Sequence, residues 1–170
     1  MGQYRFSMLK QGLFAITLAV VPLAGCSTGN VSTYGGNPSQ VASIPNIDAL
    51  DAGSALTQAR GHFQNNDFGY SAALYKRVVE LTPKNPEGYI GLGASYDRLR
   101  RFDLSDRVYA SLFKLSGGTA QYYNNLGYSY MLRGDLANAL ANFKKAQRLD
   151  PENVVVANNL KILAGASRSA

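Results

Sequence analysis

The sequence of 170 residues has a single cysteine, Cys26, a single histidine, His62, and no tryptophan. A lone cysteine excludes a disulfide within the chain and a metal site built from several thiolates. No apolar run approaches the roughly 20 residues that span a bilayer as a helix. Charged residues make up only 16% of the chain, yet 46% of residues are hydrophobic. This composition is sufficient for a folded core and excludes disorder throughout.

Acidic residues are fewer than basic ones: the chain has 11 aspartates and glutamates and 17 lysines and arginines. Two of the basic residues, Arg5 and Lys10, lie in an N-terminal segment that we expect to be removed. The others are scattered, apart from Arg98, Arg100 and Arg101. This small cluster is more typical of a solvated helix end than of a nucleic-acid site, so we expect no nucleic-acid partner.

The first 25 residues have the pattern of a secretory signal peptide. Arg5 and Lys10 precede an uncharged apolar run from Gly12 to Ala24, and small residues follow it. The run is shorter than a membrane-spanning helix, so a permanent transmembrane segment is the weaker interpretation. We expect residues 1–25 to be cleaved from the mature protein.

The sequence Leu23-Ala24-Gly25-Cys26 resembles the bacterial lipobox. The resemblance implies cleavage after Gly25 and attachment of lipid to Cys26, which would become the new N-terminus. The alternative is an unmodified cysteine beside an ordinary cleavage site. Ser27 resembles the residue that directs lipoproteins to the outer membrane, so we expect an exported protein, lipid-anchored there and facing the periplasm. Residues 26–51 are rich in Ser, Gly, Asn, Thr and Pro, which predicts a lipidated N-terminus with a flexible tether.

An internal repeat occupies residues 52–85, 86–119 and 120–153, with starts 34 residues apart. Apolar residues recur at three- and four-residue spacings, which predicts two amphipathic helices in each copy. The third copy has the clearest pattern, consisting of Tyr123, Leu126, Gly127, Tyr130, Gly134, Leu136, Ala139, Phe143, Ala146, Leu149 and Pro151. The second copy departs from it at Ser105, Leu112 and Gly117, and the first departs at Ala55 and Gln58.

This period and pattern resemble the tetratricopeptide repeat (TPR) family. The resemblance implies an all-α solenoid of three helix-turn-helix repeats. The register continues through Ala157 and Leu160, so we expect a capping helix at residues 154–164 and a frayed tail at residues 165–170.

No active site is evident. His62 falls where the other copies have Tyr96 and Tyr130, which favours a packing role over a catalytic base. The segment Gly91-Leu92-Gly93 lacks the preceding strand of a dinucleotide loop, and the carboxylates are dispersed. We therefore expect a protein that is not an enzyme, with no cofactor, no metal and no small-molecule substrate.

The resemblance to the TPR family implies a groove for a protein segment, lined mainly by the first helix of each repeat. The positions that face this groove in the family are occupied here by Leu56, Arg60, Phe63, Gln64, Glu87, Ile90, Asp97, Arg98, Gln121, Asn124, Tyr128, Met131, Leu132, Asn158 and Ile162. Met131 and Leu132 could equally pack between helices. The basic clamp that binds chaperone tails in some TPR proteins is absent, because its positions hold Leu56, Arg60, Gly91, Gln121 and Asn125.

Residues 91–110 and 123–139, together with the lipobox, resemble the TadD lipoproteins of tight-adherence (Tad/Flp) pilus systems. That resemblance implies a pilotin-like scaffold that helps to localise or assemble a secretin, which would be the protein partner. A general envelope adaptor for outer-membrane protein assembly or cell-wall enzymes is the alternative.

Overall fold

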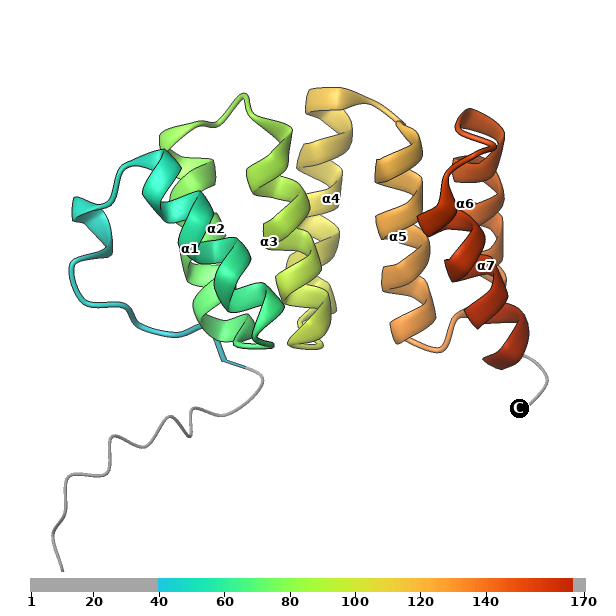
Figure 1. Cartoon of the computed structure of the whole chain (residues 1–170), viewed down its shortest axis with the longest axis horizontal. Helices are drawn as coiled ribbons and strands as arrows, with labels where there is room; N and C mark the ends of the chain where they lie inside the picture. The colour runs from blue at the N-terminus through green and yellow to red at the C-terminus, as the bar shows by residue number, and fades with distance from the viewer. Residues whose placement is uncertain (1–39, 167–170) are drawn as a thin grey trace, which may run out of the picture. The chain divides into compact units, whose positions relative to one another are not determined.

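The computed structural model describes residues 40–166, and this part of the chain is entirely helical, with no β-strand (Figure 1). The expected signal peptide, Cys26 and the first part of the expected tether lie outside the described residues. A short 3-10 helix, η1, spans Ile47–Ala49. The α-helices are α1 Ala52–Gln64, α2 Phe68–Leu81, α3 Pro86–Arg98, α4 Phe102–Ser116, α5 Ala120–Leu132, α6 Leu136–Leu149 and α7 Val154–Ala166. The predicted all-α solenoid of three helix-turn-helix repeats and one further helix is confirmed.

The helices pack as antiparallel pairs, α1 with α2, α3 with α4 and α5 with α6, and α7 packs against α6. The first helices of the repeats also contact one another, since α1 contacts α3, α3 contacts α5 and α5 contacts α7. The second helices α2, α4 and α6 make no such contacts with one another in the described chain. The array therefore curves with its first helices on the inner side, as expected for a repeat solenoid.

The first helix of each repeat begins at a residue that caps it. Asp51 accepts a hydrogen bond from Ser54 N at 2.9 Å, and Asn85 accepts one from Glu87 N at 3.0 Å. Thr119 accepts one from Tyr122 N at 3.1 Å. Such caps satisfy backbone donors that have no partner within the helix. Each repeat therefore carries a local start signal.

The turn inside each repeat passes through the left-handed region. Asn66, Arg100 and Gly134 have φ angles of 63°, 58° and 82° and follow one another at the repeat spacing of 34 residues. Glycine and asparagine adopt this conformation readily, whereas arginine does so at a cost. The turn geometry is therefore conserved along the array although the residue type changes.

Helix pairs cross closely where one partner lacks a side chain. A Cβ atom at Gly93 would lie 2.8 Å from the ring of Tyr109, and one at Gly127 would lie 2.7 Å from the ring of Phe143. Both aromatic rings are buried, so each fills the space above a glycine of its own repeat. The glycines and the aromatic residues of the repeat pattern therefore fit against each other where the helices cross.

Residues 40–51 differ from the flexible tether that was predicted. Ile44, Ile47 and Leu50 pack against the core cluster formed by α1, α2 and α3. Ala42 N donates to Gly69 O at 3.1 Å, and Arg77 Nη2 donates to Asp48 O at 2.6 Å. The prediction was wrong for this segment because its three apolar side chains cover the exposed edge of the first repeat.

The final helix, α7, begins at Val154 as expected but continues to Ala166, two residues beyond the predicted end. Leu163 and Val156 anchor it, since both are buried. The predicted frayed tail therefore does not include residues 165 and 166. Among the helices described, none has the length and hydropathy needed to cross a membrane.

Candidate protein-binding surface

The inner side of the array, which we call the first-helix face, is formed by α1, α3, α5 and α7. All positions predicted to line a groove lie on these four helices, and their exposure divides them into three groups. Exposed members are Arg60, Gln64, Arg98, Gln121, Asn158 and Ile162. Half-buried members are Leu56, Phe63, Glu87, Ile90, Asn124, Tyr128, Met131 and Leu132. Asp97 alone is buried.

A cation and an anion meet on this face between the first two repeats. Arg60 on α1 donates from Nη2 to Oε1 of Glu87 on α3. The pair is exposed, and this hydrogen bond raises the pKa of Arg60 above its ordinary value. Exposed pairs contribute little to stability, so both groups remain available to a ligand that offers a better partner.

Arg98 is held at the turn between α1 and α2. Its Nη2 donates to Asn66 Oδ1 at 3.4 Å, and its guanidinium lies 4.2 Å from the centre of the Phe68 ring. Phe63 meets the same ring edge to face, with centroids 5.3 Å apart. A guanidinium over an aromatic ring is a favourable arrangement, so Arg98 is positioned at this end of the face.

Several apolar candidates contribute to the core as well as to the surface. Leu56 packs against the core cluster formed by α1, α2 and α3, and Ile90 packs against the cluster of Tyr109, Leu112 and Tyr122. Tyr128 and Met131 pack against the cluster of Ala139, Phe143 and Leu163. The interpretation of Met131 as a packing residue is therefore the one supported. Leu132 is half-buried.

Asn124 also has a structural partner. Its Oδ1 accepts a hydrogen bond from Asn159 Nδ2 at 2.9 Å, which connects α5 to α7. Replacing Asn124 and Tyr128 would remove both this bond and core contacts. The exposed side chains Gln121 and Ile162 are therefore better probes of binding.

The prediction that Asp97 lines the groove is wrong, because this residue is only 1% exposed. Its Oδ2 accepts from Tyr109 Oη at 2.8 Å, and its Oδ1 accepts from Ser129 Oγ at 2.6 Å. Burial raises the pKa of Asp97 above its ordinary value, while these donors and Arg133 act in the opposite direction. A carboxylate buried between α3, α4 and α5 is a structural group and is inaccessible to a ligand.

Val155 was missed by the sequence reasoning. It lies on α7 at the repeat position of Glu87 and Gln121, and it is 54% exposed. Ile162 lies two turns further along the same face of α7 and is 55% exposed. The register alone could have identified Val155, because seven residues separate it from Ile162.

His62 lies at the rim of the first repeat. Its ring stacks on Tyr70 with centroids 5.2 Å apart, and its Nδ1 lies 3.3 Å from Asp67 Oδ2. This agrees with the packing role expected for it. The described residues contain no group of three or more histidine, cysteine or acidic side chains that could hold a metal ion.

Comparison with known proteins finds similar repeats. A tetratricopeptide repeat family model matches residues 120–153, and a second model of that family matches residues 56–105. The heat shock protein STI1 of Saccharomyces cerevisiae is 29% identical over 107 residues, which cover 62% of this chain. The same match covers only 18% of STI1. These matches support assignment to the tetratricopeptide repeat family.

Solved structures show the same fold. The first TPR domain of human RPAP3 has a TM-score of 0.60 at 19% identity, covering 69% of this chain and 93% of that domain. The Arabidopsis OM64 TPR domain has a TM-score of 0.59 at 16% identity, covering 71% and 98%. The first TPR of Spaghetti (RPAP3), solved with the HSP90 peptide SRMEEVD, has a TM-score of 0.56 at 19% identity, covering 70% and 97%.

Proposed function

From the premise that helices α1 to α7 form a tetratricopeptide repeat solenoid, we propose that this protein is a non-enzymatic scaffold, lipid-anchored to the outer membrane. It binds a segment of a partner protein on the first-helix face. TPR repeats suggest protein-protein interaction as the general role. The finer proposal concerns where the protein is held and which partner it binds.

The observation that carries the binding site is a group of exposed side chains on two adjacent helices. Gln121 on α5 and Asn158 on α7 are exposed amides, while Val155 and Ile162 on α7 are exposed aliphatic residues. Amides hydrogen-bond a main chain, and aliphatic side chains supply contact area. This combination suits an extended or helical segment better than a small molecule, which prefers an enclosed pocket.

A chaperone tail is a poor candidate for this segment, although one structural neighbour was solved with an HSP90 peptide. Leu56 and Gly91 occupy two of the clamp positions and offer no cation. Arg60, which does offer one, is paired with Glu87. We therefore propose a partner that is recognised through amide and aliphatic contacts.

The anchor is proposed from the lipobox at Leu23-Ala24-Gly25-Cys26. Acyl chains attached to Cys26 would hold the repeats at the outer membrane on the periplasmic side. In that position the protein would act as a pilotin-like factor for the secretin of a Tad/Flp-type pilus. A general envelope adaptor for outer-membrane protein assembly or cell-wall enzymes is the second candidate, supported by the same anchor and repeats.

The test is affinity purification of the tagged full-length protein from solubilised envelopes, with bound proteins identified by mass spectrometry. The binding variant is Gln121→Ala with Ile162→Ala on the first-helix face. Its matched control is Gln147→Ala with Leu149→Ala on α6, because Leu149 is 56% exposed and Ile162 is 55% exposed. We expect a secretin to be enriched by the native protein and the control, and lost from the binding variant.

Enrichment of assembly factors or cell-wall enzymes in place of a secretin would replace the pilotin proposal with the adaptor. Equal recovery by the binding variant and the control would refute the first-helix face as the site. Cys26→Ser tests the anchor separately. This variant should lose incorporated palmitate and leave the membrane fraction, and unchanged fractionation would refute lipid anchoring.

A further inference from the structure

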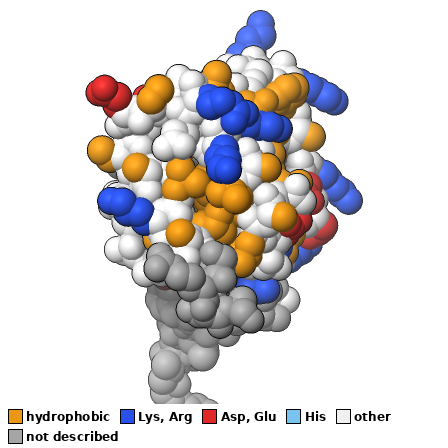
Figure 2. Space-filling view, turned by 90° about the vertical axis from the view of Figure 1, so that its right-hand side faces the viewer, with side chains coloured by type: hydrophobic (Ala, Val, Ile, Leu, Met, Phe, Trp, Pro, Cys, Tyr) orange, Lys and Arg blue, Asp and Glu red, His pale blue; other side chains and the backbone are white. Residues whose placement is uncertain are grey.

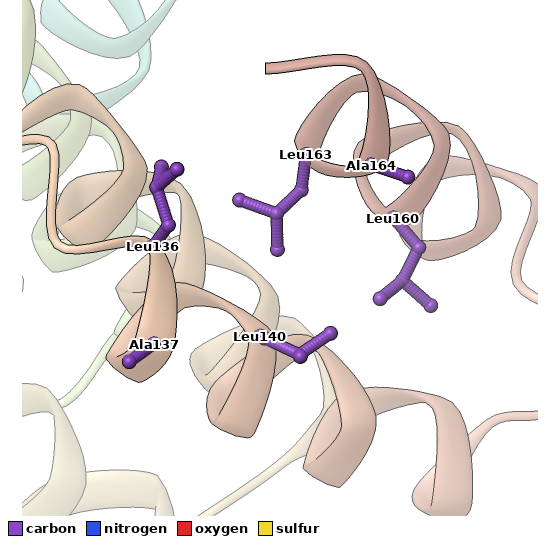
Figure 3. A pocket seen from close by; sticks show the side chains of 6 residues that line it. All are labelled: Leu136, Ala137, Leu140, Leu160, Leu163 and Ala164. Atoms are coloured by element: carbon purple, nitrogen blue, oxygen red, sulfur yellow. The ribbon is translucent and has the colours of Figure 1, made fainter. Parts of the chain in front are cut away.

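An apolar hollow lies between α6 and α7, at the last helix pair of the described array, with a volume of about 340 Å³. We call it the C-terminal hollow. It is lined by Leu136, Ala137 and Leu140 of α6 and by Leu160, Leu163 and Ala164 of α7. The leucine side chains of the two helices converge on the space between them (Figure 3). Every lining side chain is aliphatic, so this surface is distinct from the amide-bearing first-helix face.

The repeat register explains why the hollow is open. Leu160, Leu163 and Ala164 correspond to Leu92, Ser95 and Tyr96, two repeats earlier on α3. All three of those earlier residues are buried. Ala164 therefore stands where a tyrosine ring fills the equivalent space, and its small side chain leaves that space empty.

The equivalent surface in the earlier repeats is also covered by a helix. Leu104 and Val108 of α4 pack against the cluster that contains Tyr96. No described helix follows α7 to provide such a cover, and Leu140 is 39% exposed. The hollow thus has the form of a helix-binding site that the described chain leaves unoccupied.

Lys161 determines how a helix would approach this site. It occupies the repeat position of Gly93 and Gly127, where the missing side chain allows a close helix crossing. A lysine prevents an equally close approach. A helix bound here must lie further from α7 and must meet an ammonium group, which favours a carboxylate on the bound helix.

The two helices that form the hollow carry charge of one sign, and the nearest acidic residues in sequence, Asp135, Asp150 and Glu152, lie before α6 and between α6 and α7. Helices α6 and α7 carry Lys144, Lys145, Arg148 and Lys161 and no acidic residue. None of these four cations forms an ion pair with a described carboxylate. Lys144 is one helical turn beyond Leu140 on the same face. Basic side chains lie beside a hydrophobic patch on this end of the array (Figure 2).

We propose that the C-terminal hollow binds an amphipathic helix from another protein, whose apolar stripe is flanked by carboxylates. A protruding leucine or aromatic side chain enters the hollow, and the carboxylates pair with Lys161 and Lys144. Charge complementarity favours an acidic helix over a neutral one. The hollow shape favours a partner with protruding side chains over a membrane surface. The site is independent of the proposed ligand of the first-helix face.

The test measures binding of two synthetic helical peptides by fluorescence anisotropy. Both are alanine-based with leucines at alternating three- and four-residue spacings, and they differ only in carrying glutamate or lysine beside the leucines. The full chain is held in phosphatidylcholine nanodiscs, which keeps detergent away from the hollow. We expect saturable binding of the glutamate peptide and at least about tenfold weaker binding of the lysine peptide.

Two variants test the two parts of the proposal. Ala164→Tyr restores the residue type of Tyr96 and should fill the hollow. Lys161→Glu should weaken binding of the glutamate peptide by about tenfold and strengthen binding of the lysine peptide. The matched controls are Ala110→Tyr and Lys114→Glu on exposed positions of α4, which should leave both affinities unchanged. If Ala164→Tyr fails to fold by circular dichroism, Lys161→Glu still tests the charge requirement because Lys161 is exposed.

Equal affinity for both peptides, or binding unaffected by Ala164→Tyr in a folded protein, would overturn the proposal. A concentration-dependent dimer abolished by Ala164→Tyr would show that a second copy occupies the hollow. Binding to phosphatidylglycerol vesicles that is lost in Lys161→Glu, with no peptide binding, would show a membrane surface instead. Either of the last two outcomes also overturns the proposal.

Discussion

Asp97 in the second repeat accepts a hydrogen bond from Ser129 in the third repeat, with Oδ1 and Oγ 2.6 Å apart. The same hydroxyl accepts from Arg133 Nη2 at 2.8 Å, and Arg133 Nη1 donates to Asp106 Oδ2 at 2.9 Å. The buried carboxylate is thus connected through one serine to an ion pair that joins α4 to the turn after α5. This polar network fastens the second repeat to the third.

The first prediction concerns the serine. Ser129→Ala should lower the free energy of unfolding by about 1 to 3 kcal/mol, because it leaves a buried carboxylate oxygen without its donor. Urea unfolding followed by circular dichroism measures the change. Ser111→Ala is the control, since its hydroxyl is exposed and bonds only to Arg107 O. A loss at Ser129 no larger than that at Ser111 would contradict a structural role for the network.

The second prediction is a pH dependence. Burial raises the pKa of Asp97 from its ordinary value of 3.8, so the folded state holds the proton more tightly than the unfolded state. The stability linked to this proton is fully present below the ordinary pKa and is lost as the pH rises through the raised one. The free energy of unfolding of the native protein, minus that of the Asp97→Asn variant, should therefore fall with rising pH across that window.

Urea titrations at several pH values, from about pH 4 to about pH 8, measure this difference. The groups that face Asp97 are Ser105 and Tyr109 on α4, Ser129 on α5 and Arg133 after α5. Of these, Tyr109 has a pKa raised well above its ordinary value by burial, so it stays protonated in this range. A difference that stays constant or rises with pH would refute the raised pKa.

The third prediction compares two glycines in first helices. Gly127→Ala should destabilise by about 1 to 3 kcal/mol, because the added Cβ would overpack the buried helix crossing. The nearest atom of the Phe143 ring would lie 2.7 Å away. In Gly61→Ala the added Cβ would meet no neighbouring atom within 4 Å. We therefore expect the free energy of unfolding to rise by up to about 1 kcal/mol through helix propensity. Thermal unfolding of the two variants distinguishes a packing effect from a propensity effect.

The fourth prediction concerns the turn of the second repeat. Arg100 has a φ of 58°, where Gly134 in the third repeat has 82°. Arg100→Gly should raise the stability by about 1 kcal/mol, because it relieves the left-handed conformation of a residue with a Cβ atom. The reverse change, Gly134→Arg, should lower it. Chemical denaturation of both variants checks the pair, and a loss of stability in Arg100→Gly would mean that its side-chain contact with Phe102 outweighs the backbone strain.

Much of the fold could be predicted from local sequence signals. The 34-residue spacing located all three helix pairs, and the repeat pattern identified Gly127 and Phe143 as members, although their contact is known only from the structure. Gly134, a member of the repeat pattern, lies at the turn with a φ of 82°, and Asp135 caps α6, accepting from Asn138 N at 3.0 Å. These signals are local, so they are visible without knowledge of neighbouring repeats.

The surface was less predictable, because exposure depends on what packs above a residue. Asp97 occupies a repeat position associated with the groove, yet Tyr109 and Ser129 enclose it. Ile44 in the supposed tether is apolar within a polar segment, but only its contact with the first repeat shows its role. The repeat register predicts which face of a helix a side chain lies on, but it does not predict which residues of other helices pack against that side chain.

The sequence by itself determined the helices, their order and the close crossings, since periodicity, caps and small residues act within one repeat. Only the tertiary structure decided that Asp97 is a buried junction and that Ala164 opens a hollow beside Leu140. Those properties depend on helices from adjoining repeats, or on the absence of one in the described chain. The physical reason is that burial is a property of the assembled array, whereas helix formation is encoded residue by residue.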